Sequence, residues 1–366
     1  MRGRPISAIV RWYPVWCPPW ADSSHGGRQK RHGNAAVARA PLAILAATMA
    51  GTPLSLVLFG LAVAAYCVAL LAFVLYLALR RKALGDIGLA AVLAGWPLHA
   101  ASIFTRALEA GHWPLGNMYE YSTGIAFIVV TVCVVLMIRA RMRLVGLPAM
   151  ILVIALLGIA YMLYVPPGQL VPALHSYWLT IHVTAMASSS GILSFSFFFG
   201  MAYLARRWAD QRLLAVAATP AAATVGGGGV GTLTLGGGGA GGDALFGGSV
   251  LTSLAQGLRR VLPSIGTLDL WSYRFVMIGF PVWTFGVICG AIWGEHAWGR
   301  YWGWDPKETF AFITWVVFAI YLHARVTYGW KEKRAAIITA FGFTAILFTL
   351  YAVNLWIAGL HSYARA

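Results

Sequence analysis

The chain has 366 residues, of which 60% are hydrophobic and only 10% are charged, and its formal net charge is +16. A soluble domain of this size cannot keep so much apolar surface from water, so the composition excludes a soluble globular protein and predicts an integral membrane protein. The positive charge does not indicate a nucleic-acid partner. The basic residues gather at the ends of apolar segments and in the N-terminal tail, which is a topology signal.

The first 48 residues carry an unusual excess of cations. Seven arginines and lysines precede the first apolar segment, and the orientation derived below would place them outside the cell, where such residues are rare. We interpret residues 1–48 as a mis-set start, with Met49 as the initiator. The alternative, a cytoplasmic basic arm, would need one more spanning segment, and residues 41–52 are too short and too interrupted by proline to supply it.

Eight apolar stretches are long enough to cross a bilayer, which takes about 20 residues. They are residues 54–79, 86–106, 120–138, 145–164, 180–204, 274–293, 308–328 and 335–357. The sequence therefore predicts an all-α protein, a polytopic transmembrane bundle of about eight spanning helices.

A glycine tract separates the fifth apolar stretch from the sixth. Residues 209–265 include 13 glycines between Val225 and Gly248, with almost no charge among them. This composition predicts a flexible linker between the first five helices, residues 54–204, and the last three, residues 271–366. We expect the linker to be cytoplasmic and its glycine tract to be removable with little loss of activity.

Basic residues mark alternate loops. They follow the first, third, fifth and seventh apolar stretches, as Arg80, Arg81 and Lys82, then Arg139, Arg141 and Arg143, then Arg206, Arg207 and Arg212, then Lys331, Lys333 and Arg334. All four loops fall on one side, which the positive-inside rule assigns to the cytoplasm. The extracytoplasmic side then receives the loops at 111–120 and 165–179, the tryptophan-rich loop at 293–309 and the C-terminus.

The tryptophan-rich loop is the most distinctive motif. Trp298, Trp302 and Trp304 lie within seven residues and are spaced by glycines. Aromatic rings offer large flat faces, and glycine lets a ligand approach the backbone, so we predict a flat aromatic surface that holds a planar ligand. The alternative is an interfacial aromatic belt. The Asp-Pro-Lys-Glu sequence that follows, residues 305–308, predicts a helix start with an N-cap and a capping box.

The motif also carries a family resemblance. The pattern Trp-Gly-x-x-Trp-x-Trp-Asp at residues 298–305, continued by Pro-Lys-Glu-Thr, resembles the tryptophan-rich WWD signature of haem-handling membrane proteins. Segments 111–120, 178–183 and 359–363 support the match. Among these proteins, the chain resembles the CcsA/ResC family of System II cytochrome c biogenesis, named CcsB in some actinobacterial lineages. The resemblance runs from about residue 55 to the end, apart from the linker.

Two histidines are expected near the tryptophan loop. His182 lies at the outer end of the fifth predicted helix, and His361 follows the outer end of the eighth. The resemblance implies that this pair binds haem iron, for which two neutral imidazoles are a common ligand pair. For either residue alone, the alternative is a helix-end histidine that hydrogen-bonds to the backbone.

A third histidine lies within a predicted membrane span. His323 is about 15 residues into the seventh helix, so at ~1.5 Å per residue it lies more than about 20 Å deep, toward the cytoplasmic half. An ionisable residue inside a span is a candidate functional residue. The resemblance implies that it binds a second, intramembrane haem, whose opposite ligand comes from a ResB/Ccs1-type partner. The alternative is a buried histidine bonded to a neighbouring helix.

Haem propionates need cationic partners. Arg300 in the tryptophan loop and Lys307 beside it are the nearest candidates, and the alternative for each is a lipid-headgroup contact. Asp305 and Glu120 are carboxylates that can orient a histidine N–H, although the cap role accounts for Asp305. Candidates for further walls of the site are Trp113 and Asn117.

The remaining histidines have no assigned role. His99 lies within the second predicted helix, and it is a candidate ligand, packing residue or proton acceptor. His112 and His175 are loop residues. His296 lies between two tryptophans and competes as a candidate ligand.

The resemblance implies a function in cytochrome c biogenesis at the plasma membrane. In that reading, a multi-pass protein transports haem b and presents it at the extracytoplasmic face. With its partner subunit, as part of a holocytochrome c synthase, it attaches the haem to the C-x-x-C-H cysteines of apocytochrome c. One alternative is a haem exporter or chaperone without ligase activity. The other is a respiratory b-type cytochrome, which predicts paired histidines within helices at matching depths.

Overall fold

The computed structural model describes residues 51–170, 174–218, 241–357 and 359, with the side chains of 241–249 left out. The predictions for residues 1–48, for most of the glycine tract and for His361 lie outside the described residues. The described part of the chain forms a unit that begins at Thr52.

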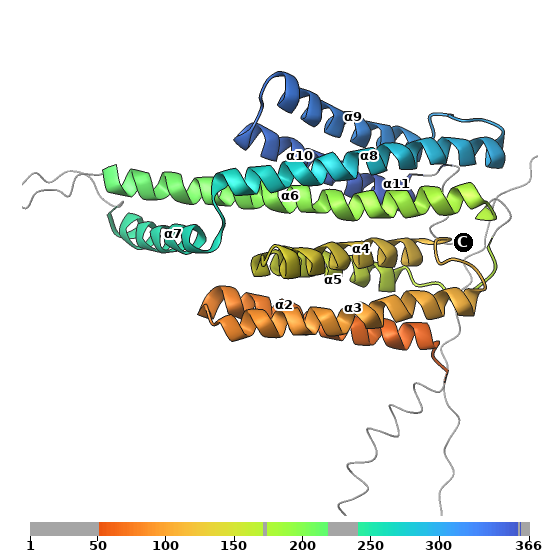
Figure 1. The fold of residues 1–366 in the computed structure, drawn as a ribbon, viewed down its shortest axis with the longest axis horizontal. Coiled ribbons are helices and arrows are strands. Elements are labelled where there is room, and N and C mark those ends of the chain that lie inside the picture. Colours follow the sequence, from red (N-terminus) through yellow and green to blue (C-terminus); the bar gives the residue numbers. More distant parts are fainter. Residues whose placement is uncertain (1–50, 171–173, 219–240, 358, 360–366) are drawn as a thin grey trace, which may run out of the picture. The chain divides into compact units, whose positions relative to one another are not determined.

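The described residues are helical and contain no strand. Eight helical segments are long and apolar enough to cross a membrane, which confirms the predicted number. Figure 1 shows them running side by side: α2 (Leu54–Leu79), α3 (Lys82–Ala110), α4 (Met118–Arg139), α5 (Gly146–Met162) with a preceding 3-10 turn (Arg143–Val145), α6 (Tyr177–Ala218), α8 (Ile265–Trp298), α9 (Pro306–Thr327) and α10 (Glu332–Leu347). The last span continues through a π-helical turn, η3 (Phe348–Ala352), into α11 (Val353–Trp356).

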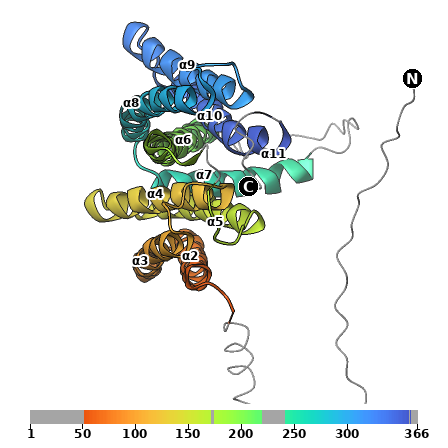
Figure 2. The ribbon, with the colours of Figure 1, turned by 90° about the vertical axis from the view of Figure 1, so that its right-hand side faces the viewer.

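Helix α6 is the centre of the bundle. It packs against α4 on one side and against α8 and α10 on the other, while α2 and α3 form a hairpin beyond α4 and α5. Figure 2, which looks along the bundle, shows this layering. Small residues let the helices approach closely, as is common in membranes. A Cβ on Gly279 of α8 would lie 2.6 Å from Leu193 of α6, and one on Gly200 of α6 would lie 2.6 Å from Thr339 of α10.

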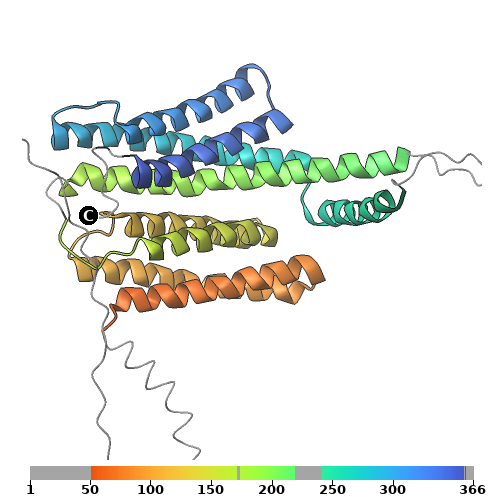
Figure 3. The same ribbon diagram turned by 180° about the vertical axis from the view of Figure 1, so that it is seen from behind.

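The predicted linker, residues 209–265, is partly helical. Helix α6 continues to Ala218, α8 begins at Ile265, and between them lies α7 (Gly241–Val261). Figure 3 shows the bundle from behind, with α6 extending beyond its neighbours and α7 beside that extension. Hydropathy identifies the apolar part of a helix but not its polar ends. Residues 205–218 are rich in alanine, leucine and arginine, which favour helix, so α6 continues past the apolar stretch.

Candidate functional site

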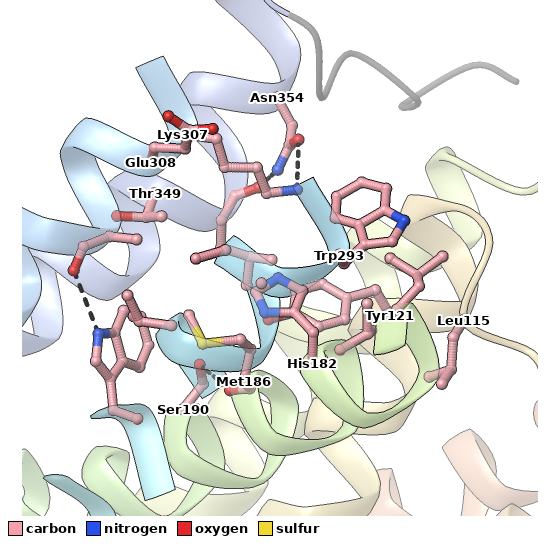
Figure 4. Close-up of a pocket in the computed structure, with 18 of the residues that line it drawn as sticks. Leu115, Tyr121, His182, Met186, Ser190, Trp293, Lys307, Glu308, Thr349 and Asn354 are labelled. Carbon is pink, nitrogen blue, oxygen red and sulfur yellow. Dashed lines mark hydrogen bonds between the residues drawn. The ribbon is translucent and has the colours of Figure 1, made fainter. Parts of the chain in front are cut away.

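A cavity opens at the end of the bundle that carries the loops 111–117, 163–176 and 299–305. Its enclosed space measures about 130 Å³, and the cavity is open at its mouth. Its walls come from the loop before α4, from α6 and α8, from the tryptophan loop, and from α9, η3 and α11. The cavity therefore brings together segments from both halves of the chain, as Figure 4 shows.

His182 of α6 lines this cavity. Its Nδ1 lies 2.7 Å from the backbone oxygen of Gly286 in α8. A carbonyl only accepts hydrogen bonds, so Nδ1 is the protonated nitrogen, and a neutral ring keeps a lone pair on Nε2. A histidine that donates from one nitrogen to a backbone carbonyl is in the usual state of a metal-binding imidazole.

Two residues of α8 fix the plane of this ring. A Cβ on Gly290 would lie 2.6 Å from both Cε1 and Nδ1 of His182, so only glycine leaves room for the ring. On the same helix, Trp293 is buried and stacks on the imidazole, with ring centroids 6.3 Å apart and planes 15° apart. Our sequence reasoning did not single out either residue for this role. The glycines at 286, 290 and 294, spaced by four, mark a helix face built for close approach.

The three tryptophans do not form the predicted flat surface. Only Trp302 lines the cavity. The ring of Trp304 is perpendicular to it at 89° and is 67% exposed, while Trp298 packs edge-on against Trp293 at 4.8 Å. The flat surface was predicted from the types of ring alone, whereas the backbone of the loop decides where each ring points. Left-handed conformations at Gly299 (φ 70°) and Trp304 (φ 56°) turn the chain between the rings and send them in different directions.

The predicted helix start after the tryptophan loop is confirmed. Asp305 is the N-cap of α9, Pro306 occupies the first turn, and a capping box with Glu308 is present. The Glu308 carboxylate also accepts hydrogen bonds from the backbone N–H groups of Gly303 at 2.8 Å and Asp305 at 3.2 Å. Helix α9 therefore fixes the end of the loop that places Trp302 in the cavity wall.

One of the two predicted propionate partners lines the cavity. Lys307 projects into it and donates to Oδ1 of Asn354 at 3.1 Å, as Figure 4 shows. Arg300 is exposed and packs against Gly303, where a Cβ would lie 2.1 Å from the guanidinium carbon, and it does not line the cavity. Asn354 follows the π-helical turn η3. Such turns are frequent at functional sites because they shift the register of a helix face.

A buried ion pair fixes the loop before α4. Arg106 donates to Glu120 at 2.9 Å and to the backbone oxygen of Val165 at 2.8 Å, and the other carboxylate oxygen of Glu120 accepts from the N–H of Gly116 at 2.9 Å. Both side chains are at most 3% exposed. Glu120 thus holds the loop directly at Gly116 and is itself paired with Arg106, and the expectation that it orients a histidine was wrong. The loop's Asn117, predicted as a wall, lines the cavity and caps α4.

The other histidines lie away from this cavity. His323 is exposed on the outer side of α9, four residues before the helix ends, with Nδ1 3.5 Å from the Thr327 hydroxyl. His99 is fully buried and lies 3.2 Å from the Tyr66 hydroxyl. His296 is bonded to Ile292 of its own helix. His112 and His175 line a second cavity beside the first, together with the predicted wall residue Trp113.

Gly359 lies against Asp305, at the end of the tryptophan loop. A Cβ on Gly359 would lie 2.7 Å from Oδ1 of Asp305. Gly359 is two residues before His361 in the sequence. Among the described residues, no group of three or more histidine, cysteine, aspartate or glutamate side chains is placed to hold a bare metal ion. The cavity instead offers one imidazole, aromatic walls and one ammonium group.

These features define a polytopic helical membrane protein with an aromatic cavity, open at one end of the bundle, that contains a histidine held by a backbone carbonyl. The chain belongs to the cytochrome c assembly protein family, whose model matches residues 115–361. It is therefore a multi-pass membrane protein with a role in cytochrome c assembly.

Relatives of known name support this membership. The chain is 36% identical to the cytochrome c biogenesis protein CcsA of Gloeobacter violaceus, over 70% of this chain and 80% of that protein. It is equally identical to the proteins of the same name from Microcystis aeruginosa, over 72% and 83%, and Synechococcus elongatus, over 77% and 88%. The predicted CcsA-type family is confirmed.

Proposed function

We propose that the cavity holds haem b at the extracytoplasmic face of the plasma membrane and presents it for covalent attachment to apocytochrome c. The observation that carries this proposal is the setting of His182, whose Nδ1 is committed to the Gly286 carbonyl 2.7 Å away within a cavity lined by tryptophan rings. This arrangement suits an iron ligand beside a large planar ring.

The second axial ligand in this proposal is His361. The resemblance assigns it, and the position of Gly359 against Asp305 supports it, because Gly359 is two residues before His361 in the sequence. Lys307 then pairs with a propionate, because it is the cation that lines the cavity among the described residues. Trp302 packs against the porphyrin, while Trp298 and Trp304 support the loop from behind and from outside.

The extracytoplasmic orientation rests on charge. The four basic loops lie at the end of the bundle opposite the cavity, so the positive-inside rule places the cavity outside. The plasma-membrane location comes from the family resemblance.

The attachment step needs positioning more than acid–base chemistry. Each thiol of the C-x-x-C-H motif adds across one haem vinyl group, with sulfur bonding to one carbon and the thiol hydrogen moving to the other, so no net oxidation occurs. Haem supplies the vinyl groups and the iron. The chain holds the ring by its iron and a propionate, and the apocytochrome histidine replaces one imidazole.

The route to the cavity involves a partner in this proposal. His323 is a candidate ligand of a second haem within the membrane, with the opposite ligand supplied by a ResB/Ccs1-type subunit. The exposure of His323 on α9 supports this, because a ligand on the outer side of the bundle needs a second molecule to complete its site.

A haem exporter that passes its cargo to another ligase is the second candidate function, because it would use the same cavity. The test is expression of the chain with its partner and an apocytochrome in a host that lacks its own cytochrome c maturation proteins. Covalent haem in the cytochrome, retained after denaturation, supports the ligase. Haem in the cavity with no thioether product supports the exporter. A b-type cytochrome would instead keep a stable haem and export none.

A further inference from the structure

Helix α7 presents an uncovered apolar face. Over the part with described side chains, Val250, Leu251 and Leu254 are 66%, 42% and 51% exposed. At about 100° per residue they fall within one arc of roughly 100° on the helix. Ala255, next to this arc, is fully buried, and Gln256 is exposed beyond it. Further along the same arc, Leu258 and Val261 are half-buried. The helix is therefore amphipathic, and the exposed part of its apolar arc is the stretch from Val250 to Leu254.

The position of α7 is fixed at one end of the bundle. Figure 1 shows it beside the extension of α6, past the ends of α2 and α3, and Figure 2 shows it lengthwise where α6 is seen nearly end-on. The two views together show that its axis is inclined to that of α6. Arg206 of α6 donates to the backbone oxygens of Arg259 at 3.0 Å and Leu262 at 2.6 Å, which holds the C-terminal end of α7.

A second bond sets α7 at the level of the membrane boundary. The guanidinium of Arg80 donates to the backbone oxygen of Gly257 at 3.2 Å. Arg80 is the residue that ends the membrane-spanning helix α2. A helix tied to this residue lies at the level at which lipid headgroups surround the protein.

The positive charge at the end of the bundle near α7 is complementary to acidic lipid headgroups. The ends of α2, α3, α4, α5, α9 and α10 lie at the same end of the bundle as α7. Their last turns and connecting loops, with α6, carry more than half of the arginines and lysines among the described residues. They include Arg80, Arg81, Lys82, Arg139, Arg141, Arg143, Arg206, Arg207, Lys331, Lys333 and Arg334. Arg260 of α7 itself is exposed beside the apolar arc. Clusters of this kind attract anionic headgroups.

We propose that α7 is an interfacial helix that binds the surface of an acidic bilayer. Val250, Leu251 and Leu254 insert at the boundary between headgroups and acyl chains, and Arg260 contacts the phosphates. Amphipathic helices with basic flanks bind membranes in this way. The helix then anchors the connection between α6 and α8, which pack on each other and supply His182 and its carbonyl partner. This inference is independent of haem.

The test places spin labels on the two sides of α7 in the full chain. The four native cysteines are replaced, and Leu254→Cys and Gln256→Cys variants are labelled and reconstituted in nanodiscs of phosphatidylcholine alone or mixed with phosphatidylglycerol. We expect the label at 254 to be more accessible to oxygen than to a water-soluble nickel complex in the mixed bilayer, and the label at 256 to show the reverse.

Two results would overturn the proposal. Equal exposure of both labels to the nickel complex in both bilayers would mean that α7 stays in water. Protection of the label at 254 from both reagents would mean that a second copy or another protein covers the face. An Arg260→Gln variant sharpens the result, because it should reduce the difference between the two lipid compositions and leave the assembly of the bundle unchanged.

Discussion

His182 and His323 carry the same chemistry in opposite surroundings. His182 is half-buried, bonded to Gly286 and stacked on Trp293, and it lines a cavity made by the chain itself. His323 is exposed on the outer side of α9, with a long contact to Thr327 and an edge-on ring contact with Tyr328. The first histidine is held in one orientation before any ligand arrives. The second can join a closed site only with another molecule.

This contrast separates what one chain provides from what a complex provides. A ligand whose ring is fixed by a carbonyl, a glycine and a tryptophan loses little freedom on binding, which favours affinity. An exposed ring loses its conformational freedom only when the partner docks. We therefore expect the outer site to tolerate the absence of the partner far better than the intramembrane site does.

Removing the outer ligand should have the largest effect. In His182→Ala the cavity keeps its walls and loses its iron ligand, so cytochrome c maturation should fall to background. Haem staining of the apocytochrome co-expressed with the chain and its partner measures this. The matched control is His296→Ala, because His296 is exposed and bonds only within α8. Equal loss in both variants would contradict the assignment.

Displacing the imidazole of His182 without removing it should have the second largest effect. In Gly290→Ala the added Cβ would lie 2.6 Å from two atoms of His182, so the imidazole must move. Changes to residues that orient a metal ligand typically cost about 10–100-fold in affinity, and we expect a loss of haem affinity in this range by titration. Gly266→Ala in the same helix meets no atom within 4 Å and serves as the control.

The intramembrane histidine should show a conditional effect. His323→Ala should leave haem bound by the chain alone unchanged and should lower the haem content of the complex with the partner. The haem absorbance per mole of protein, measured for the chain alone and for the complex, tests this difference. An equal loss in both would mean that His323 acts within this chain.

Replacing the cavity cation should weaken binding moderately. Lys307→Gln removes one charge-assisted contact, which is worth about 1.5 kcal/mol, or roughly a tenfold loss of haem affinity. Arg300→Gln should change the affinity far less, since Arg300 does not line the cavity. If Arg300→Gln lowered the haem affinity more than Lys307→Gln did, the propionate would lie on the outside of the loop.

Deleting residues 226–239 should have the smallest effect. The deletion removes most of the glycine tract and stops before α7 begins at Gly241. Maturation activity should stay near the wild-type level at equal protein level. Loss of activity with normal protein level would show that the tract is more than a linker.

The sequence predicted the spans well because the bilayer imposes length and apolarity on each of them. It also predicted the start of α9, since Asp305 and Glu308 are local signals. It missed the end of α6 and all of α7, which lie outside the hydrocarbon and obey no length rule. It missed the partnership of Arg106 with Glu120, because an ion pair between two helices leaves no local pattern.

The sequence predicted the types of residue in the site better than it predicted their arrangement. His182 was found through its place at a helix end beside an aromatic motif. The orientation of Trp302 and Trp304 depends on the backbone of the loop, where a left-handed tryptophan is not expected from composition. The roles of Gly290 and Trp293 depend on how α8 meets α6, which a single sequence does not reveal.

The most direct test of the haem site is the visible spectrum of the purified protein as wild type and as His182→Gly, each with and without added imidazole. Low-spin haem in the wild type, its loss or conversion to high spin in the variant, and its return with imidazole would support iron ligation by His182. A variant spectrum identical to the wild type, or wild-type protein without haem even beside its partner, would contradict it.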